Sequence, residues 1–204
     1  MCRFQFVFIL GIVSFANARN VTISNTLPRM DVRGNLMDVH DGAVFWDETS
    51  GGSFLYYGMG YTNCTEKRGI IPPLDCPGIY KPFGSCGFRE DHEVRLYSSP
   101  NLVDWTLVSE SVFPQAVRPR GIYFRPKVLF NAQSKKYVLW INFLSPARSP
   151  LEAYSNATLI VAISDTRQGP FQVTTAKANV AVSGAGDFTV RSLVFRIVNL
   201  SHIL

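Results

Sequence analysis

The sequence predicts an all-β protein. Short apolar runs bounded by glycine, proline, asparagine and serine recur along the chain, and the 3.6-residue periodicity of amphipathic helices is nearly absent. The 204 residues are 47% hydrophobic and 13% aromatic, which is enough for one ordinary core and argues against a disordered chain. The net charge of +5 is spread along the sequence without a basic run, so we expect no nucleic-acid partner.

The first 18 residues have the pattern of a secretory signal peptide. Arg3 precedes an apolar run from Phe4 to Phe15, and an A-N-A cleavage sequence ends at Ala18. A membrane anchor is the alternative, but the run is shorter than the roughly 20 apolar residues that span a bilayer. We therefore expect a secreted, extracellular protein that has no membrane association once the signal peptide is removed.

Four N-x-[ST] sequons agree with secretion, because such asparagines accept glycans on exposed loops. They lie at Asn20, Asn63, Asn156 and Asn199. We therefore expect a glycoprotein.

Cysteine usage also fits an extracellular protein. Cys2 belongs to the predicted signal peptide, while Cys64, Cys76 and Cys86 lie within one segment. Outside the cell we expect two of these three to form a disulfide and one to remain a thiol. A zinc site is the alternative, but the spacings are not those of a C-x-x-C knuckle. We predict no metal site and no cofactor.

The first strand-rich unit spans roughly residues 36–112. Residues 42–61, GAVFWDETSGGSFLYYGMGY, have the pattern strand, polar turn, strand. After a long insertion, residues 94–108, VRLYSSPNLVDWTLV, add a third strand, an S-S-P-x-L-x-x-W turn and a fourth strand. The unit is therefore predicted to be a meander of four strands.

The second unit spans roughly residues 120–176 and repeats this order. Residues 121–143 carry two apolar runs, FRPKVLF and YVLWINF, around the polar turn NAQSKK, which predicts a β-hairpin of two buried strands. Residues 158–173, TLIVAISDTRQGPFQV, supply the other two strands. Four strands per unit, repeated along the chain, predict the blades of a β-propeller.

A third unit begins at the S-G-A-G-D-F-T-V sequence that ends at residue 190, and residues 191–204 do not continue the pattern. Propellers close with about four to eight blades, so two blades and the start of a third predict an incomplete propeller. We expect a lead-in at residues 19–35, the incomplete propeller at residues 36–190 and a divergent C-terminal tail. On this interpretation the chain is the N-terminal part of a longer domain.

Four motifs in order resemble the five-bladed propellers of glycoside hydrolase family 43, and most closely their exo-galactanase branch. They are H-D-G followed by Y-Y-G, then V-x-x-Y-S-S-P-x-L-x-x-W, then R-P-K-V-x-x-N-x-x-[ST]-K-K-Y-V-x-W, and then S-D-T-x-x-G-P-F. The resemblance covers residues 36–190. It implies a five-bladed fold and a secreted glycosidase that hydrolyses O-glycosyl bonds of a polysaccharide or oligosaccharide.

The resemblance also implies catalytic residues. Glycosidases need two carboxyl groups at the scissile bond, one to protonate the leaving oxygen and one to activate water or attack carbon. Asp41 matches the family's general base, although without the resemblance its position between His and Gly indicates a turn residue. Asp187 matches the aspartate that tunes the pKa of the acid. The acid itself is a glutamate of the fourth blade, beyond Leu204, so we expect this chain alone to be inactive.

Four further residues are candidates for substrate binding. Two cations beside a proline, Arg125-Pro126-Lys127, are an unusual start for a buried strand and indicate either the mouth of the central channel or a site. The alternative for Arg125 is an ion pair with a buried acid between blades. His40 precedes the candidate base, and Phe124 stands where galactanase-like relatives often carry a catalytic glutamate, offering a ring that can stack on a sugar.

The replacement of that glutamate favours a second interpretation of function. On this second interpretation the chain lacks both this carboxylate and the acid, and it is a non-catalytic, secreted carbohydrate-binding protein. The strand aromatics do not decide between the two, because strands favour aromatic residues for packing alone. We expect packing roles for Trp46, Tyr56, Tyr57, Trp105 and Trp140.

Overall fold

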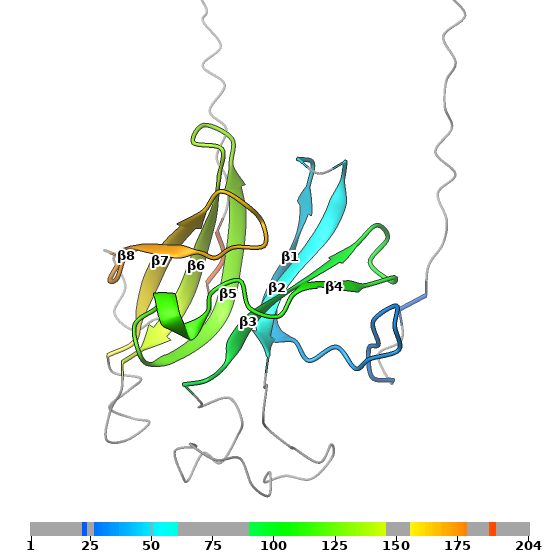
Figure 1. Ribbon diagram of the computed structural model, residues 1–204, viewed down its shortest axis with the longest axis horizontal. Helices are drawn as coiled ribbons and strands as arrows, with labels where there is room; N and C mark the ends of the chain where they lie inside the picture. The colour runs from blue at the N-terminus through cyan, green and yellow to red at the C-terminus, as the bar shows by residue number, and fades with distance from the viewer. Residues whose placement is uncertain are drawn as a thin grey trace, which may run out of the picture.

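The computed structural model describes residues 22–23, 27–49, 51–60, 90–145, 156–178 and 188–190. These residues form two four-stranded antiparallel sheets and a single 3-10 turn at Gln115–Val117, without an α-helix (Figure 1). None of the described residues belongs to a helix long and apolar enough to cross a membrane. The all-β prediction is confirmed.

Each sheet is a meander in which neighbouring strands follow one another in sequence. The first sheet matches the unit predicted at residues 36–112, and the second matches the unit predicted at residues 120–176. Two four-stranded units of this kind are consistent with two propeller blades, whereas the number of five blades stays a prediction. The strands of the first sheet are β1 (His40–Asp47), β2 (Ser53–Gly60), β3 (Glu93–Ser99) and β4 (Thr106–Ser109), and those of the second are β5 (Ile122–Asn131), β6 (Lys136–Leu144), β7 (Thr158–Ser164) and β8 (Gln172–Thr175).

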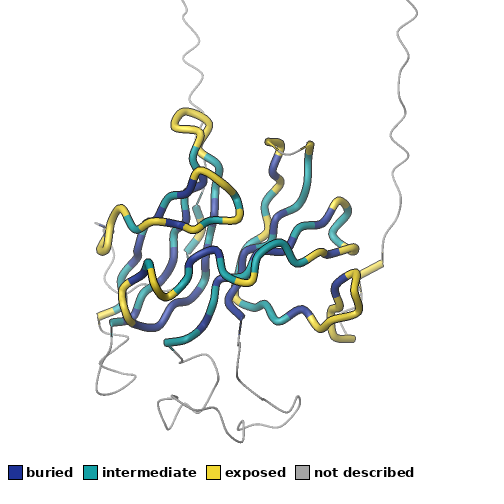
Figure 2. Tube along the Cα trace, in the orientation of Figure 1, coloured by how far each residue is buried: buried dark blue, intermediate teal, exposed yellow. Residues whose placement is uncertain are grey.

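The main core lies between the two sheets, where β1 and β2 pack against β5 (Figures 1 and 2). Alternate residues of each strand point to the same face, so one register buries a whole apolar row. Leu55 and Tyr57 of β2 and Leu139 and Ile141 of β6 are fully buried in this core. Burying each such side chain stabilises the fold by about 1.5–3 kcal/mol.

The segment before β1 covers the outer strands of the first sheet on its opposite face. The backbone amide of Val32 donates to the carbonyl of Trp105 at 2.8 Å, and Met37 packs with Tyr97 and Trp105 in a second cluster. Tyr97 and Trp105 are thereby almost completely buried. The packing role predicted for Trp105 is confirmed.

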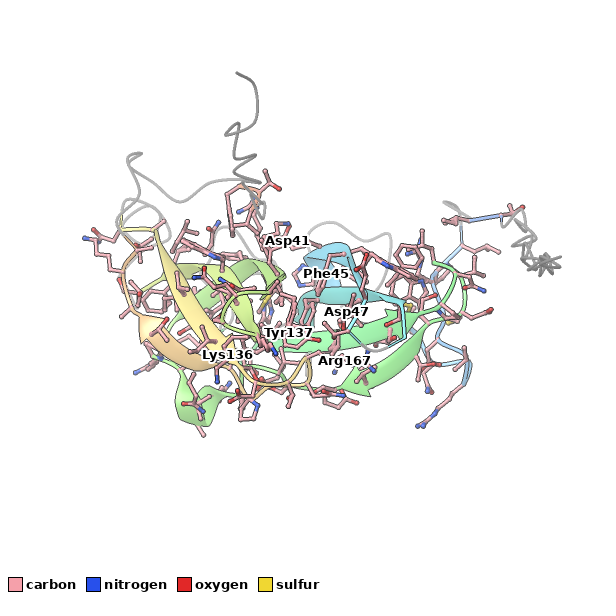
Figure 3. The ribbon with its side chains drawn as sticks, turned by 90° about the horizontal axis from the view of Figure 1, so that it is seen from above. Asp41, Phe45, Asp47, Lys136, Tyr137 and Arg167 are labelled. Atoms are coloured by element: carbon pink, nitrogen blue, oxygen red, sulfur yellow. The ribbon has the colours of Figure 1, made fainter. Side chains whose placement is uncertain are left out.

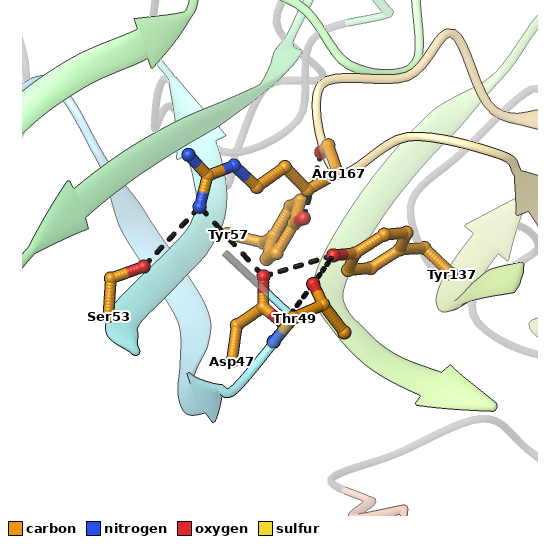
Figure 4. Close-up of polar contacts among 6 residues, drawn as sticks. All are labelled: Asp47, Thr49, Ser53, Tyr57, Tyr137 and Arg167. Carbon is orange, nitrogen blue, oxygen red and sulfur yellow. Dashed lines mark hydrogen bonds and ion pairs between the residues drawn. The ribbon is translucent and has the colours of Figure 1, made fainter. Parts of the chain in front are cut away.

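A polar network at the end of β1 joins the sheets (Figures 3 and 4). The Asp47 carboxylate, 1% exposed, accepts hydrogen bonds from the Tyr137 hydroxyl at 3.0 Å and from the amide and hydroxyl of Thr49 at 3.0 and 2.7 Å. The Arg167 guanidinium lies 3.9 Å from the same carboxylate, and the Arg167 carbonyl accepts from the Tyr57 hydroxyl at 2.8 Å. Because Asp47 and Tyr57 belong to the first sheet, the network fixes the second sheet against it.

Burial raises the pKa of the Tyr137 hydroxyl and that of Tyr57, so both groups stay protonated and can donate. A buried carboxylate that loses a donor keeps its full desolvation penalty. The network is therefore more costly to break than its few hydrogen bonds suggest.

We expect Tyr137→Phe to lower the free energy of unfolding by about 1–3 kcal/mol, because it removes a donor from the buried Asp47 carboxylate. Urea unfolding followed by circular dichroism measures this value. Tyr56→Phe is the matched control, since it removes a hydroxyl outside the network, and its expected effect is within about 0.5 kcal/mol. Equal effects of the two substitutions would contradict a stabilising network.

Candidate active site

The first strands of the two sheets begin with the same irregularity. The pairing register shifts by one residue between His40 and Ala43 in β1 and between Phe124 and Lys127 in β5. The second residue of each bulge has a positive φ, 57° at Asp41 and 54° at Arg125. Bulges re-aim side chains and are over-represented beside active sites. We call the end of the two sheets at which β1 and β5 begin the rim.

Positive φ is unusual for side chains other than glycine, asparagine and aspartate. Asp41 tolerates it because a short polar side chain can bond locally, whereas for Arg125 it costs about 1–2 kcal/mol. Strained residues of this kind cluster at functional sites, where the surrounding fold holds them in place. The backbone therefore marks both positions independently of the side chains that they carry.

The residues that follow Asp41 and Arg125, Gly42 and Pro126, fit the bulges in the H-D-G and R-P-K motifs. A Cβ atom on Gly42 would lie 1.9 Å from the Tyr57 carbonyl oxygen, so β1 can approach β2 here only with glycine. Pro126 lies inside the β5 bulge, where a missing backbone N–H does not interrupt the ladder. The glycine of one motif and the proline of the other are thus explained by the bulges.

Asp41 is exposed and lies where the two sheets meet (Figure 3). The Lys127 ammonium donates a hydrogen bond to the carbonyl oxygen of Gly42 at 3.1 Å, so a cation from β5 is held beside the backbone of Asp41. The rim therefore combines an accessible carboxylate with fixed positive charge.

His40 packs beneath Asp41. Its ring meets the ring of His92, the residue before β3, edge to face at a centroid distance of 5.7 Å. Burial lowers the pKa of His40 below its ordinary value of 6.5, although the charges of Asp41 and Asp38 act in the opposite direction. His40 is thus neutral near pH 7.

The other two rim candidates are less exposed. Phe124 is 7% exposed and packs with Ile122 and Leu144 in a small cluster within the second sheet. Arg125 is half-buried at its bulge. The sugar-binding roles of His40, Phe124, Arg125 and Lys127 stay predictions.

Several predicted features lie outside the described residues. These are Asp187, the three clustered cysteines, the signal peptide and three of the four sequons. Asn156 is described and exposed, as a glycan acceptor must be. The roles of all these residues stay predictions.

The structure adds a buried arginine that the sequence did not single out. The Arg118 guanidinium donates to the carbonyls of Phe113 at 3.0 Å and of His92, and it stacks 4.7 Å from the centre of the Tyr123 ring. Burial lowers the pKa of Arg118, yet a guanidinium stays protonated in proteins. In the sequence Arg118 reads as part of an exposed basic loop, R-P-R-G, so only its distant partners reveal its burial.

A cavity of about 380 Å³ opens beside this arginine, between the segments that precede β3 and β5. Its lining includes Glu90, Asp91, Arg118 and Arg120, and Arg120 forms an ion pair with Glu90 at 2.6 Å. Because Arg118 holds the His92 carbonyl and His92 contacts His40, a continuous chain of contacts links the cavity to the residue before Asp41. Carboxylates and guanidiniums around a small cavity suit a ligand rich in hydroxyl groups.

Solved glycosidase structures are similar to this chain in fold. An exo-β-1,3-galactanase from Clostridium thermocellum has 22% identity and a TM-score of 0.50, over 74% of this chain and 26% of that one. An exo-β-1,3-galactanase from Phanerochaete chrysosporium, solved with galactose, has 20% identity and a TM-score of 0.49, over 75% and 29%. A GH43 β-1,3-galactosidase has 22% identity and a TM-score of 0.49, over 77% and 28%.

The resemblance to glycoside hydrolase family 43 that the motifs predicted is thus confirmed at the level of the fold. This chain spans less than a third of the length of these three proteins. No family model matches the sequence, and no curated protein is significantly similar to it.

We expect Arg125→Gly to be more stable than Arg125→Ala by about 1 kcal/mol, because alanine keeps the strain of a positive φ and glycine relieves it. Both variants lose the side chain, so the comparison isolates the backbone. Urea unfolding of the two variants measures the difference. If the alanine variant were equally stable, the bulge would not hold a strained residue.

Stability should fall as the pH is lowered below about 6.5. The unfolded chain binds a proton at His40 near 6.5, whereas the folded chain, whose His40 pKa is lowered, binds it only at a lower pH. The stabilising difference is therefore complete above pH 6.5 and is lost as the pH falls toward the folded pKa. We expect His40→Gln to flatten this part of the profile, as measured by urea midpoints; an unchanged slope would assign the loss to other groups.

Proposed function

We propose that this chain forms part of the active site of a secreted glycoside hydrolase that cleaves O-glycosyl bonds. The observation that carries this proposal is the pair of equivalent bulges, which sets Asp41 and Arg125 at the same rim of adjacent sheets. Central channels of propellers are lined by the first strands of their blades, so residues at this rim face one shared mouth. The fold shared with solved glycosidases supports the same reading.

In the proposed mechanism Asp41 is the general base that activates water. Its carboxylate is exposed to solvent, and the Lys127 ammonium is hydrogen-bonded to the carbonyl oxygen of the next residue, Gly42. Asp187 would orient the sugar and raise the pKa of the acid. Hydrolysis also requires that general acid, which the family resemblance places on a fourth blade, so we propose that this chain alone binds sugar without cleaving it.

The proposed substrate is a polysaccharide or oligosaccharide, with galactose the first sugar to test. Structures of similar fold were solved with galactose and with β-1,3-galactotriose. In this chain the Arg118 cavity places polar groups within reach of hydroxyls near the rim. The four sequons and the exposed Asn156 support an extracellular location, where such polymers occur.

We expect the chain recovered from the medium of a eukaryotic host to bind β-1,3-galactotriose in isothermal titration calorimetry. Asp41→Asn should weaken binding about tenfold, since it removes a charge-assisted hydrogen bond to a hydroxyl. Asp104→Asn, on the exposed β3–β4 turn, is the matched control and should leave affinity unchanged. Absence of saturable binding by the native chain would overturn the proposed site, and retention inside the cell would overturn secretion.

The second candidate is a secreted carbohydrate-binding protein without catalysis. Phe124 favours it, because this position carries a buried ring where galactanase-like relatives often carry a carboxylate. Incubating β-1,3-galactan with a longer form of the protein that contains the remaining blades distinguishes the hydrolase from the binding protein. Release of reducing sugar supports the hydrolase, and binding without release supports the binding protein.

A further inference from the structure

Exposed apolar side chains gather on one side of the molecule. All the large hydrophobic residues that are exposed among the described residues belong to the segment before β1, to β1 or to the β3–β4 turn, and the second sheet contributes none. They are Ile23, Leu27, Met30, Val32, Leu36, Val44, Trp46 and Val103. An exposed apolar surface of this kind marks an interaction site.

The two bulges align the sheets residue by residue. By their registers, Trp46 corresponds to Phe130 and Phe54 corresponds to Tyr137. The ring contacts repeat as well, with centroids 4.8 Å apart for Trp46 and Phe54 and 5.1 Å apart for Phe130 and Tyr137. The same aromatic pair therefore stands at the same place on both sheets.

On the second sheet this face is covered, because it packs on the first sheet. Val128 is 3% and Tyr137 is 5% exposed there. On the first sheet the equivalent face is open along β1, where Val44 is 45% and Trp46 is 47% exposed. Met37 and Val39, which precede β1, pack with side chains of β2, β3 and β4 on this face, and among the described residues they leave Val44 and Trp46 of β1 uncovered.

The internal interface shows what fits such a face. The first sheet covers the second with Phe45, Leu55 and Tyr57. Their counterparts on the second sheet are Leu129, Val138 and Trp140, which are only half-buried. Within one chain, the first sheet covers Val128 and Tyr137 of the second sheet. The second sheet of another copy carries the equivalent covering surface, which fits the Val44 and Trp46 face of the first sheet.

We propose that two copies of this chain associate head to tail, with the Trp140 face of one copy on the Trp46 face of the other. The contact repeats the interface between the two sheets of a single chain. Head-to-tail contacts generate rings when the rotation closes, and two or three copies would bring four or six sheets together, within the range of propellers.

The new contact is more apolar than the internal one. Phe54 stands where the second sheet has Tyr137, and Asn131 stands where the first sheet has Asp47, so the buried network of Asp47 and Tyr137 is not repeated. The contact thus relies on apolar burial without the fixed polar tie. We expect association to depend on protein concentration.

Multi-angle light scattering after size exclusion tests this proposal on the full chain. The native protein should elute at two or three times the mass of one chain, and Trp46→Glu and Trp140→Glu should each reduce it to a single chain. Mixing the two variants should restore a dimer with one copy of each, because each retains one intact face. Thr106→Glu, at an exposed position of the outer strand β4, is the control and should leave the assembly unchanged.

Circular dichroism establishes whether each variant is folded. If Trp46→Glu does not fold, Val44→Lys replaces it on the same face, and Val138→Lys replaces Trp140→Glu in the same way. A monomeric native chain would overturn the proposal, and it is the result expected if further blades of a longer polypeptide cover the face. Dissociation by Trp46→Glu with no effect of Trp140→Glu would overturn it in favour of a symmetric contact. A mixture that stays monomeric would overturn it as well. None of these outcomes depends on the proposed sugar site.

Discussion

Packing of one four-stranded sheet on the next is the constraint on which the rest of this structure depends. An antiparallel sheet of this composition has two apolar faces, and a pair of sheets buries only one face of each. The shared face contains Leu55, Tyr57 and Leu139 and is closed at one end by Asp47 and Tyr137. Because this packing sets β1 beside β5, it also decides which residues meet at the rim.

Much of this fold could be predicted from the sequence, because strands and turns are local. Alternating apolar residues and polar turns placed the eight strands in two units that the structure confirms. The polar interior could not be predicted in the same way. Asp47 reads as a turn residue in W-D-E-T and Arg118 as a surface cation, since the partners that bury them, Tyr137 and His92, lie far along the chain.

The candidate site was predictable in part. The motifs predicted that Asp41 and Arg125 belong to a site at the mouth of a channel, but neither motif showed that both residues occupy bulges with positive φ. A bulge is a property of two paired strands, so it arises from the register of β1 on β2 and of β5 on β6. Gly42 and Pro126 were the available signals of the two bulges. Glycine permits the close backbone approach at the first bulge, and proline, which has no N–H, fits where the ladder needs no hydrogen bond.

The two proposals, self-association and sugar binding, are linked through the rim. Each first strand contributes one bulge, so Asp41 and Arg125 represent the contribution of two sheets, and every additional sheet at the mouth adds another. A sugar that contacts bulges from more than one copy binds the assembled form more tightly than the single chain. Such a ligand must then favour assembly by the same free energy by which assembly favours the ligand. The exposed Trp46 face and the carboxylate at the rim are thus parts of one equilibrium.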